Sequence, residues 1–341
     1  MRSRSSNRDS LQDLLTPDSV GPYLAKRGLI EPGVKVESVE LTGGISNVVL
    51  AVKGDKARFV VKQSLPRLRV KDDWPAKRER AITEAEALRF VAQITPGAVP
   101  EVLDCDGESF VITLARAPQT WRNWKTVLLS GEANVAIASE LGRVLAVWHS
   151  TTKGSAEIEG RFNDFEAFEQ LRVDPYYRTV MKRNPEVAAT VSGYVGEMAK
   201  RRICLVHGDY SPKNVLIGSK SMWILDFETA HFGDPAFDVA FMLNHLCLKA
   251  IHKPQHFDGY RLCSHAFWNA YILEAGQGFA GSDGYVLGHL ACLMVARVDG
   301  KSPAEYLSES ERCATREIAI SWLTKLPSGV GAAWTSLRES L

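Results

Sequence analysis

The chain has 341 residues, enough for one large domain or two modest ones with hydrophobic cores. Its 41 Lys and Arg residues nearly balance 40 Asp and Glu residues, so the formal net charge is +1, which gives no support for a nucleic-acid or membrane-surface partner. Hydrophobic residues make up 45% of the chain, an ordinary value for a globular protein, and no apolar segment is long enough to span a bilayer. We expect a soluble protein with no membrane partner; the sequence gives no oligomeric state.

The six cysteines indicate a reducing compartment. None falls in a C-x-x-C pair, and their spacing suits neither a zinc site nor a compact disulfide framework. Most are flanked by apolar residues, so we expect them to be small buried hydrophobic residues. A cytoplasmic location follows as a prediction.

The first part of the chain has a strand-rich pattern. After a polar tail at residues 1–16, which we expect to be disordered, three strand-like segments are separated by turns at 42–44 and 53–55: 34–41, 48–52 and 59–62. A stretch that Pro75 opens then has helical spacing at Ala81, Ala85, Leu88 and Ala92. A short strand pair is expected at 101–103 and 110–114. The basic residues between Arg67 and Arg80 are interrupted by acids and are interpreted as a solvated helix entrance.

After residue 114 the pattern becomes mainly helical. Residues 138–148 form an apolar helix face, residues 203–226 form a strand-loop-strand unit, and Gly218–Ser221 is a turn. Ser302-Pro303-Ala304-Glu305 is interpreted as a capping box that begins a helix. The predicted fold class is therefore α+β, with a strand-rich N-lobe at 17–116 and a larger, mainly helical C-lobe at 117–341.

The strongest chemical signal is His207-Gly208-Asp209-Tyr210-Ser211-Pro212-Lys213-Asn214, followed by Asp226-Phe227-Glu228. A strand ends at His207, a loop containing Pro212 follows, and a hairpin then leads directly into Asp226. This order is expected to hold Asp209, Asn214, Asp226 and Glu228 at the rim of a single cleft. Turns favour Asp and Asn in any protein, but that preference does not explain two acids and an amide around one short hairpin.

Phosphoryl transfer needs this set of side chains. A carboxylate must receive or orient the proton of the attacking hydroxyl, and hard oxygen ligands must hold Mg²⁺ on the phosphates. Asp209 suits the first role, and Asn214 and Asp226 suit the second. Glu228 is a candidate ligand for a second ion. Lys213 either neutralises the transferred phosphate or is a solvated loop lysine, and the sequence favours neither interpretation.

The pattern H-G-D-x-x-x-x-N with a following D-x-E resembles the group of aminoglycoside phosphotransferases, choline kinases and methylthioribose kinases. The resemblance implies a two-lobed protein-kinase-like fold, ATP and Mg²⁺ as cofactors, and a small hydroxyl compound as the substrate. It implies that Asp209 is the catalytic base, that Asn214 and Asp226 bind the metal, and that His207 orients the loop. It extends to Phe237-Asp238-Val239-Ala240, where Asp238 resembles the buried acid that supports the catalytic loop.

The strand-rich part supplies the expected nucleotide site. Lys62 ends an apolar strand, and Glu84 lies in the following helix; the resemblance selects Glu84 over Glu86 as the partner of this lysine. The segment Thr42–Asn47 is either a hairpin turn with permissive glycines or a loop that closes over phosphates through backbone N–H groups, with Gly44, Ser46 and Asn47 as candidates. Leu114, just before the connection between the lobes, is also assigned to the nucleotide site.

The acceptor and the alternatives remain open at this stage. Residues 60–88 resemble methylthioribose kinases in particular, whereas the loop after Asp209 is more similar to general aminoglycoside-phosphotransferase relatives. Arg297 either contacts the substrate or pairs with an acid. A non-catalytic nucleotide-binding module would lack a base, a lysine or a metal ligand, and none is missing here. A protein kinase is disfavoured because no D-F-G…A-P-E segment is evident.

Overall fold

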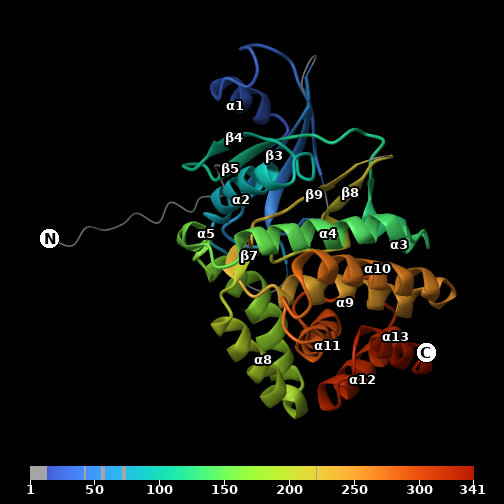
Figure 1. Ribbon diagram of the computed structural model, residues 1–341. Coiled ribbons are helices and arrows are strands. Elements are labelled where there is room, and N and C mark those ends of the chain that lie inside the picture. The colour runs from blue at the N-terminus through green and yellow to red at the C-terminus, as the bar shows by residue number, and fades with distance from the viewer. Residues whose placement is uncertain (1–13, 42–43, 55–57, 71–73, 220) are drawn as a thin grey trace. The chain divides into compact units, whose positions relative to one another are not determined.

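The computed structural model describes residues 14–41, 44–54, 58–70, 74–219 and 221–341 (Figure 1). The tail at 1–13 and the turn residues Thr42, Gly43, Asp55 and Lys220 therefore lie outside the described residues. The chain divides into two compact units. The first takes the described residues up to Arg89 together with Pro100–Ala117, and the second takes Phe90–Val99 and Pro118–Leu341.

The first unit is built on an antiparallel five-stranded sheet. Its strands lie in the order β1-β2-β3-β5-β4, with bounds Glu37–Glu40, Asn47–Lys53, Arg58–Ser64, Val111–Ala115 and Val102–Asp106. The predicted strands are thus present, although β1 begins three residues later than expected. Two helices accompany the sheet in sequence, α1 (Val20–Lys26) and α2 (Arg80–Ile94).

Apolar residues of the central strands form the core of the first unit. The buried cluster takes residues from β2, β3 and β5 and packs them with α1; it contains Val20, Leu24, Val48, Leu50, Val52, Phe59, Val61, Leu65 and Val111. Burying one such side chain stabilises the fold by about 1.5–3 kcal/mol. This core fixes the position of Lys62, whose strand is the middle of the sheet.

The predicted start of α2 at Pro75 is wrong. The interpretation of the basic residues as solvated holds for Arg67 and Arg69, which are exposed, and fails at Arg80. Pro75 forms an isolated antiparallel bridge with Arg67, and the helix begins only at Arg80. Arg80 is fully buried and donates to the carbonyl oxygens of Leu65 (2.9 Å) and Lys77 (2.5 Å). Backbone carbonyls in a buried loop need donors, and a guanidinium offers five.

The second unit is mainly helical. Three short strands form one sheet in the order β6-β8-β9 (Arg122–Asn123, Val215–Ile217, Met222–Ile224), and β7 (Cys204–Val206) pairs with β10 (His231–Gly233). The helices are α3 (Trp124–Leu129), α4 (Val135–Thr152), α5 (Ala156–Phe162), α6 (Glu166–Phe168), the π-helix η2 (Glu169–Arg178), α7 (Thr179–Arg183), η3 (Pro185–Val187), α8 (Ala188–Lys200), η4 (Pro212–Asn214), α9 (Ala236–His252), η5 (Pro254–His256), α10 (Phe257–Ala275), α11 (Asp283–Asp299), α12 (Glu309–Thr324) and α13 (Val330–Glu339).

The core of the second unit surrounds α9, which is buried from Ala236 to Ile251. Helices α4 and α10 lie side by side (Figure 1) and approach closely at Gly142, where an added Cβ would lie 2.2 Å from the Phe267 carbonyl oxygen. Gly142 therefore allows the two backbones to pack. The predicted apolar face of α4 is confirmed, since Ala138, Leu141, Val144, Leu145 and Trp148 are all buried.

One sequence expectation fails in the second unit. No helix begins at Ser302, because the Glu305 carboxylate pairs with Lys125; the capping box is formed instead by Ser308 and Glu311 at the start of α12. Residues 90–99, which the sequence places in the N-lobe, group with the second unit. The Ala98 carbonyl oxygen accepts a hydrogen bond from the Ile224 amide at 2.8 Å, which ties this segment to β9.

No helix in the described part of the chain is both long and apolar enough to cross a membrane.

Candidate active site

The loop that follows β7 is held by the carboxylate of Asp238. This residue lies in the first turn of α9, and its two oxygens accept hydrogen bonds from the backbone amides of His207 (2.7 Å) and Gly208 (2.8 Å). His149 on α4 lies 3.3 Å from the same carboxylate. Burial alone would raise the pKa of Asp238, but these hydrogen bonds and the two histidines outweigh it and lower the pKa. An ionised Asp238 therefore fixes the loop at its first two residues.

Gly208 is required by the shape of this loop. Its φ is +78°, and an added Cβ would lie 2.6 Å from Thr229 Oγ1 and 2.7 Å from the Thr229 carbonyl oxygen. Both the left-handed backbone and the close approach exclude a larger residue. Thr229 Oγ1 in turn donates to the His207 carbonyl oxygen at 3.2 Å.

His207 orients the loop as a neutral imidazole. Its Nε2 donates to the Leu225 carbonyl oxygen at 3.1 Å, so Nδ1 is left to accept the Asp209 amide at 3.1 Å. Burial lowers the pKa of His207 below its ordinary value, which favours the neutral ring, and the two hydrogen bonds select this tautomer. The ring also packs on Phe227 with a centroid distance of 4.2 Å. His207 therefore joins the loop to the segment that carries Asp226.

Asp209 is almost completely buried, and two cations meet its carboxylate. Arg172 Nη2 and Lys213 Nζ each lie 2.9 Å from Asp209 Oδ2, and Asn214 Nδ2 donates to the same oxygen at 2.8 Å. Burial alone would raise the pKa of Asp209, but Arg172 and then Lys213 more than offset it and lower the pKa. Asp209 is therefore an ionised carboxylate at neutral pH.

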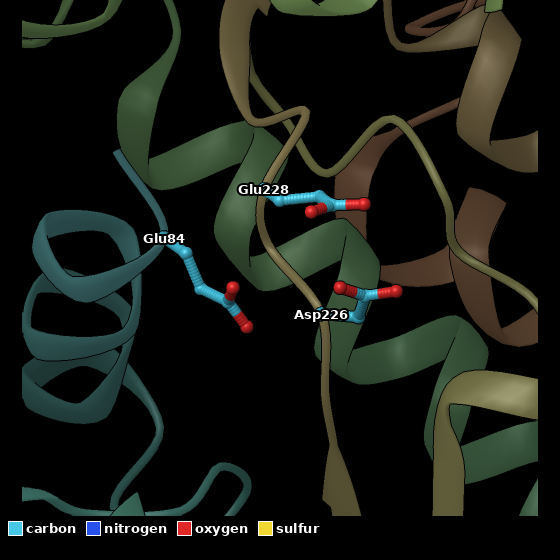
Figure 2. A group of neighbouring side chains, drawn as sticks. All are labelled: Glu84, Asp226 and Glu228. Atoms are coloured by element: carbon cyan, nitrogen blue, oxygen red, sulfur yellow. The ribbon is translucent and has the colours of Figure 1, made fainter. Parts of the chain in front are cut away.

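The remaining candidate ligands lie close to this group. Asn214 uses its amide nitrogen to contact Asp209, which leaves the side-chain oxygen Oδ1 as its ligand atom. The carboxylates of Asp226 and Glu228 project from one loop (Figure 2), and oxygens of the two lie within 4.8 Å of one another. The loop that carries Asp226 and Glu228 is held next to Asn214, because the Leu225 amide donates to the Asn214 carbonyl oxygen at 2.8 Å.

The backbone of Asp226 is unusual. Its φ is +71°, in the left-handed region that non-glycine residues rarely adopt. This conformation costs about 1–2 kcal/mol, and the neighbouring hydrogen bonds of Leu225 hold it in place. A strained residue with a carboxylate at a candidate metal site is consistent with a functional constraint on its direction.

In the first unit, Lys62 and Glu84 form a buried ion pair. Lys62 Nζ lies 2.7 Å from Glu84 Oε2, and the two side chains are 10% and 2% exposed. Glu84 is drawn on α2 in Figure 2. The pairing of this strand lysine with this helix glutamate is the one expected from the sequence.

The other nucleotide-site candidates belong to the same sheet region. Asn47 Oδ1 accepts from Ser64 at 3.1 Å, and Asn47 Nδ2 donates to Ser46 Oγ at 2.9 Å. Gly44 is exposed, with open space where a Cβ would be. Leu114 is buried in β5, opposite Val60 of β3.

Arg297 lies in the last turn of α11. It donates to Ser302 Oγ at 3.2 Å and to the Ser302 carbonyl oxygen. Among the described residues, the expected direct pairing of Arg297 with an acid is not found.

Arg172 is the residue that sequence reasoning missed. It lies on the π-helix η2, and besides Asp209 it contacts the carbonyl oxygens of Gly208 (2.8 Å) and Leu171 (2.6 Å). The only sequence signal is a cation placed between two apolar residues, Leu171 and Val173, in a segment of mixed polarity. His149, which supports Asp238, was also missed and lies on the predicted apolar face of α4.

Comparison with known proteins identifies the family. The model of the phosphotransferase enzyme family matches residues 37–262, about two thirds of the chain. The chain belongs to this family. The family assignment confirms the resemblance found in the catalytic loop and the prediction of a phosphotransferase.

Individual phosphotransferases are similar to this chain over most of its length. A methylthioribose kinase from Bacillus cereus is 24% identical over 276 residues, which cover 72% of this chain and 69% of that protein. A choline/ethanolamine kinase family protein from Mesorhizobium loti has a TM-score of 0.53 at 16% identity, with 94% of this chain and 99% of that chain covered. An amicoumacin kinase solved with AMP-PNP and Ca²⁺ has a TM-score of 0.56 at 15% identity, with 91% and 94% covered. These structures confirm the protein-kinase-like fold.

Proposed function

We propose that this phosphotransferase moves the γ-phosphoryl group of ATP to a hydroxyl of a small molecule in a Mg²⁺-dependent reaction. The observation that carries the proposal is the arrangement around Asp209. One loop brings an ionised carboxylate, a lysine and an amide oxygen together, and the next segment adds two further carboxylates. This is the set of groups that phosphoryl transfer needs.

Asp209 is proposed to orient the acceptor hydroxyl. Because Arg172 and Lys213 lower its pKa, the carboxylate is a weak base and takes the proton only as the new bond to phosphorus forms. That timing suits a loose transition state, in which the attacking oxygen carries its proton until late. Lys213, which is half-exposed, can also lie against the oxygens of the transferred group.

The donor set fits Mg²⁺. Asn214 Oδ1 and the carboxylates of Asp226 and Glu228 are hard oxygen ligands, and no sulfur or nitrogen ligand is among them. When bound, the ion would neutralise charge on the phosphates. Lys62, held by Glu84, is proposed to contact the nucleotide phosphates, with Gly44, Ser46, Asn47 and Leu114 at the same nucleotide.

A methylthioribose-like sugar is a second candidate for the acceptor, since relatives named methylthioribose kinase match more than two thirds of the chain. A non-catalytic nucleotide-binding module is disfavoured, because the base, the lysine and the ligand side chains are all present. We also propose a cytoplasmic location. All six cysteines are free thiols, and Cys204, Cys247, Cys263 and Cys292 are buried.

The test is ADP release from ATP and Mg²⁺ across a panel of hydroxyl compounds, including methylthioribose, choline, aminoglycosides and simple sugars. Asp209→Ala should abolish acceptor-dependent release and retain ATP binding. Asp258→Ala is the matched control, since Asp258 is a surface aspartate that pairs only with Arg261 and Arg338 among the described residues. Full activity in Asp209→Ala, or failure of the wild-type protein to bind ATP, would contradict the proposal.

A further inference from the structure

A group of cations surrounds Tyr306 in the second unit. Lys125 Nζ and Lys249 Nζ lie 5.9 Å and 5.5 Å from the centre of its ring. His245 precedes Lys249 by one turn of α9, and its carbonyl oxygen accepts from Lys249 Nζ at 3.2 Å. We call Lys125, Lys249 and Arg297 the cationic cluster, and His245 lies beside it as a neutral ring.

The cationic cluster is short of negative charge. Glu305 pairs with Lys125, but neither Lys249 nor Arg297 has a carboxylate within ion-pair distance among the residues that the structure describes. Burial, and then Lys125 and Arg297, lower the pKa of Lys249 to about 7. Burial, and then Lys249 and Arg297, lower the pKa of His245 well below its ordinary value. Cations in this environment repel one another unless an anion joins them.

The same place holds polar atoms without partners. Arg297 is 9% exposed, and its Nε is buried with no hydrogen-bond partner in the described part of the chain; the same is true of the Tyr306 hydroxyl. A buried donor that finds no acceptor is costly, and native proteins rarely leave one without a ligand or water. An oxyanion would accept hydrogen bonds from both groups.

Two sets of contacts join the cationic cluster to the catalytic loop. Asn123 Nδ2 donates to the Lys213 carbonyl oxygen at 2.6 Å, and Asn123 Oδ1 caps the helix α3 by accepting from the Lys125 amide at 3.0 Å. The cluster member Lys125 is therefore two residues away from a direct partner of the catalytic loop. The two hydrogen bonds of Asn123 thus connect Lys125 of the cluster to the backbone of Lys213.

The second set of contacts is aromatic. Arg172, the partner of Asp209, lies 5.9 Å above the Tyr176 ring. Tyr176 stacks on Phe241 with a centroid distance of 6.0 Å, and Phe241 contacts the His245 ring at 4.9 Å. Successive side-chain contacts therefore connect Asp209 to His245, which lies one turn before Lys249 of the cluster.

We propose that the acceptor carries an oxyanion, a carboxylate or a phosphate, which binds at the cationic cluster while its hydroxyl lies at Asp209. Arg297 and Lys125 contact the oxyanion, whose negative charge favours the protonated form of the fully buried Lys249. This inference rests on the proposed function and narrows it. It disfavours polycationic aminoglycosides and choline, because a cationic acceptor would meet like charges.

The first experiment compares matched acceptors that differ only in the anionic group. ADP release is measured with glycerol, glycerate and glycerol 3-phosphate, and with ribose, ribonate and ribose 5-phosphate. An anionic member should be used at least about tenfold better than its neutral counterpart, as expected for a charge-assisted contact. The carboxylate and phosphate members distinguish the two sources of oxyanion. Turnover confined to neutral or cationic acceptors would refute the inference and leave the kinase proposal intact.

The second experiment does not depend on finding the acceptor. Binding of inorganic phosphate is measured by titration calorimetry on the full chain saturated with ADP and Mg²⁺. Arg297→Gln and Lys125→Gln should each weaken binding by about tenfold, whereas Arg143→Gln, which removes a surface cation paired with Glu140, should not. Thermal unfolding of each variant checks that it folds. Absence of phosphate binding, or binding that neither cluster variant changes, would overturn the inference.

Discussion

Replacing Arg172 by methionine tests the residue that only the structure reveals. The change keeps much of the side-chain volume on η2 and removes the guanidinium. Asp209 then loses one of its two cations, and the carbonyl oxygens of Gly208 and Leu171 lose their donor. The substitution should therefore affect both the stability of the second unit and the protonation of the catalytic carboxylate.

The expected loss of stability follows from the contacts. Removing one partner of a buried ion pair typically costs about 3–5 kcal/mol, because the other charge stays buried. Asp209 keeps Lys213 at 2.9 Å and Asn214 at 2.8 Å, so the lower end, about 3 kcal/mol, is expected. The matched control is Arg178→Met on the same helix. Its partner is Glu169, both side chains are partly exposed, and the change should cost less than about 1 kcal/mol.

The pH dependence gives a second readout. Arg172 holds the pKa of Asp209 below its ordinary value, so the stabilisation is present above that ordinary value and is lost as pH falls through the folded-state pKa. In Arg172→Met the pKa rises, and the acid side of the activity profile should move to higher pH. Urea unfolding at neutral pH and the pH profile of kcat measure both effects. If Arg172→Met matches Arg178→Met in stability and its acid limb does not move, the assigned role is wrong.

Two further substitutions test other parts of the site. Gly208→Ala forces a side chain onto a left-handed backbone and places its Cβ 2.6 Å from Thr229 Oγ1. It should therefore lower the free energy of unfolding by about 2–4 kcal/mol and reduce kcat. Wild-type stability in urea would show that the loop adjusts freely. Glu84→Gln should raise KM for ATP several-fold, because Lys62 loses its carboxylate partner, whereas the control Glu86→Gln should leave KM unchanged. Equal effects of the two variants in steady-state assays would mean that the ion pair does not position Lys62.

Much of the catalytic loop could be predicted because its groups are close in sequence. Asp209, Lys213 and Asn214 lie within six residues, so one short 3₁₀ turn is enough to bring them together. Gly208 is explained by the same local geometry, since only glycine fits against Thr229. Asp238 acts from a distant helix, and its assignment comes from resemblance rather than from spacing.

The contacts that were missed depend on long-range packing. Arg172 is thirty-seven residues before Asp209 in the chain. Charged residues surround it in the sequence, and no local pattern tells which of them will be buried. A run of charged residues is usually solvated. Arg80 is buried instead, because it donates hydrogen bonds to loop carbonyl oxygens, and no local sequence pattern predicts these contacts. The capping box is misplaced for the same reason, since Glu305 has a tertiary partner in Lys125.

The most direct test of the central claim is Asp209→Asn, which keeps the shape of the side chain and removes its charge. With the acceptor identified by the panel, the account predicts that kcat falls by at least about 10²-fold, the usual contribution of a positioned acid or base, while the Kd for ADP stays within about twofold. A variant that turns over at the wild-type rate would contradict the assignment of Asp209 as the group that receives the hydroxyl proton.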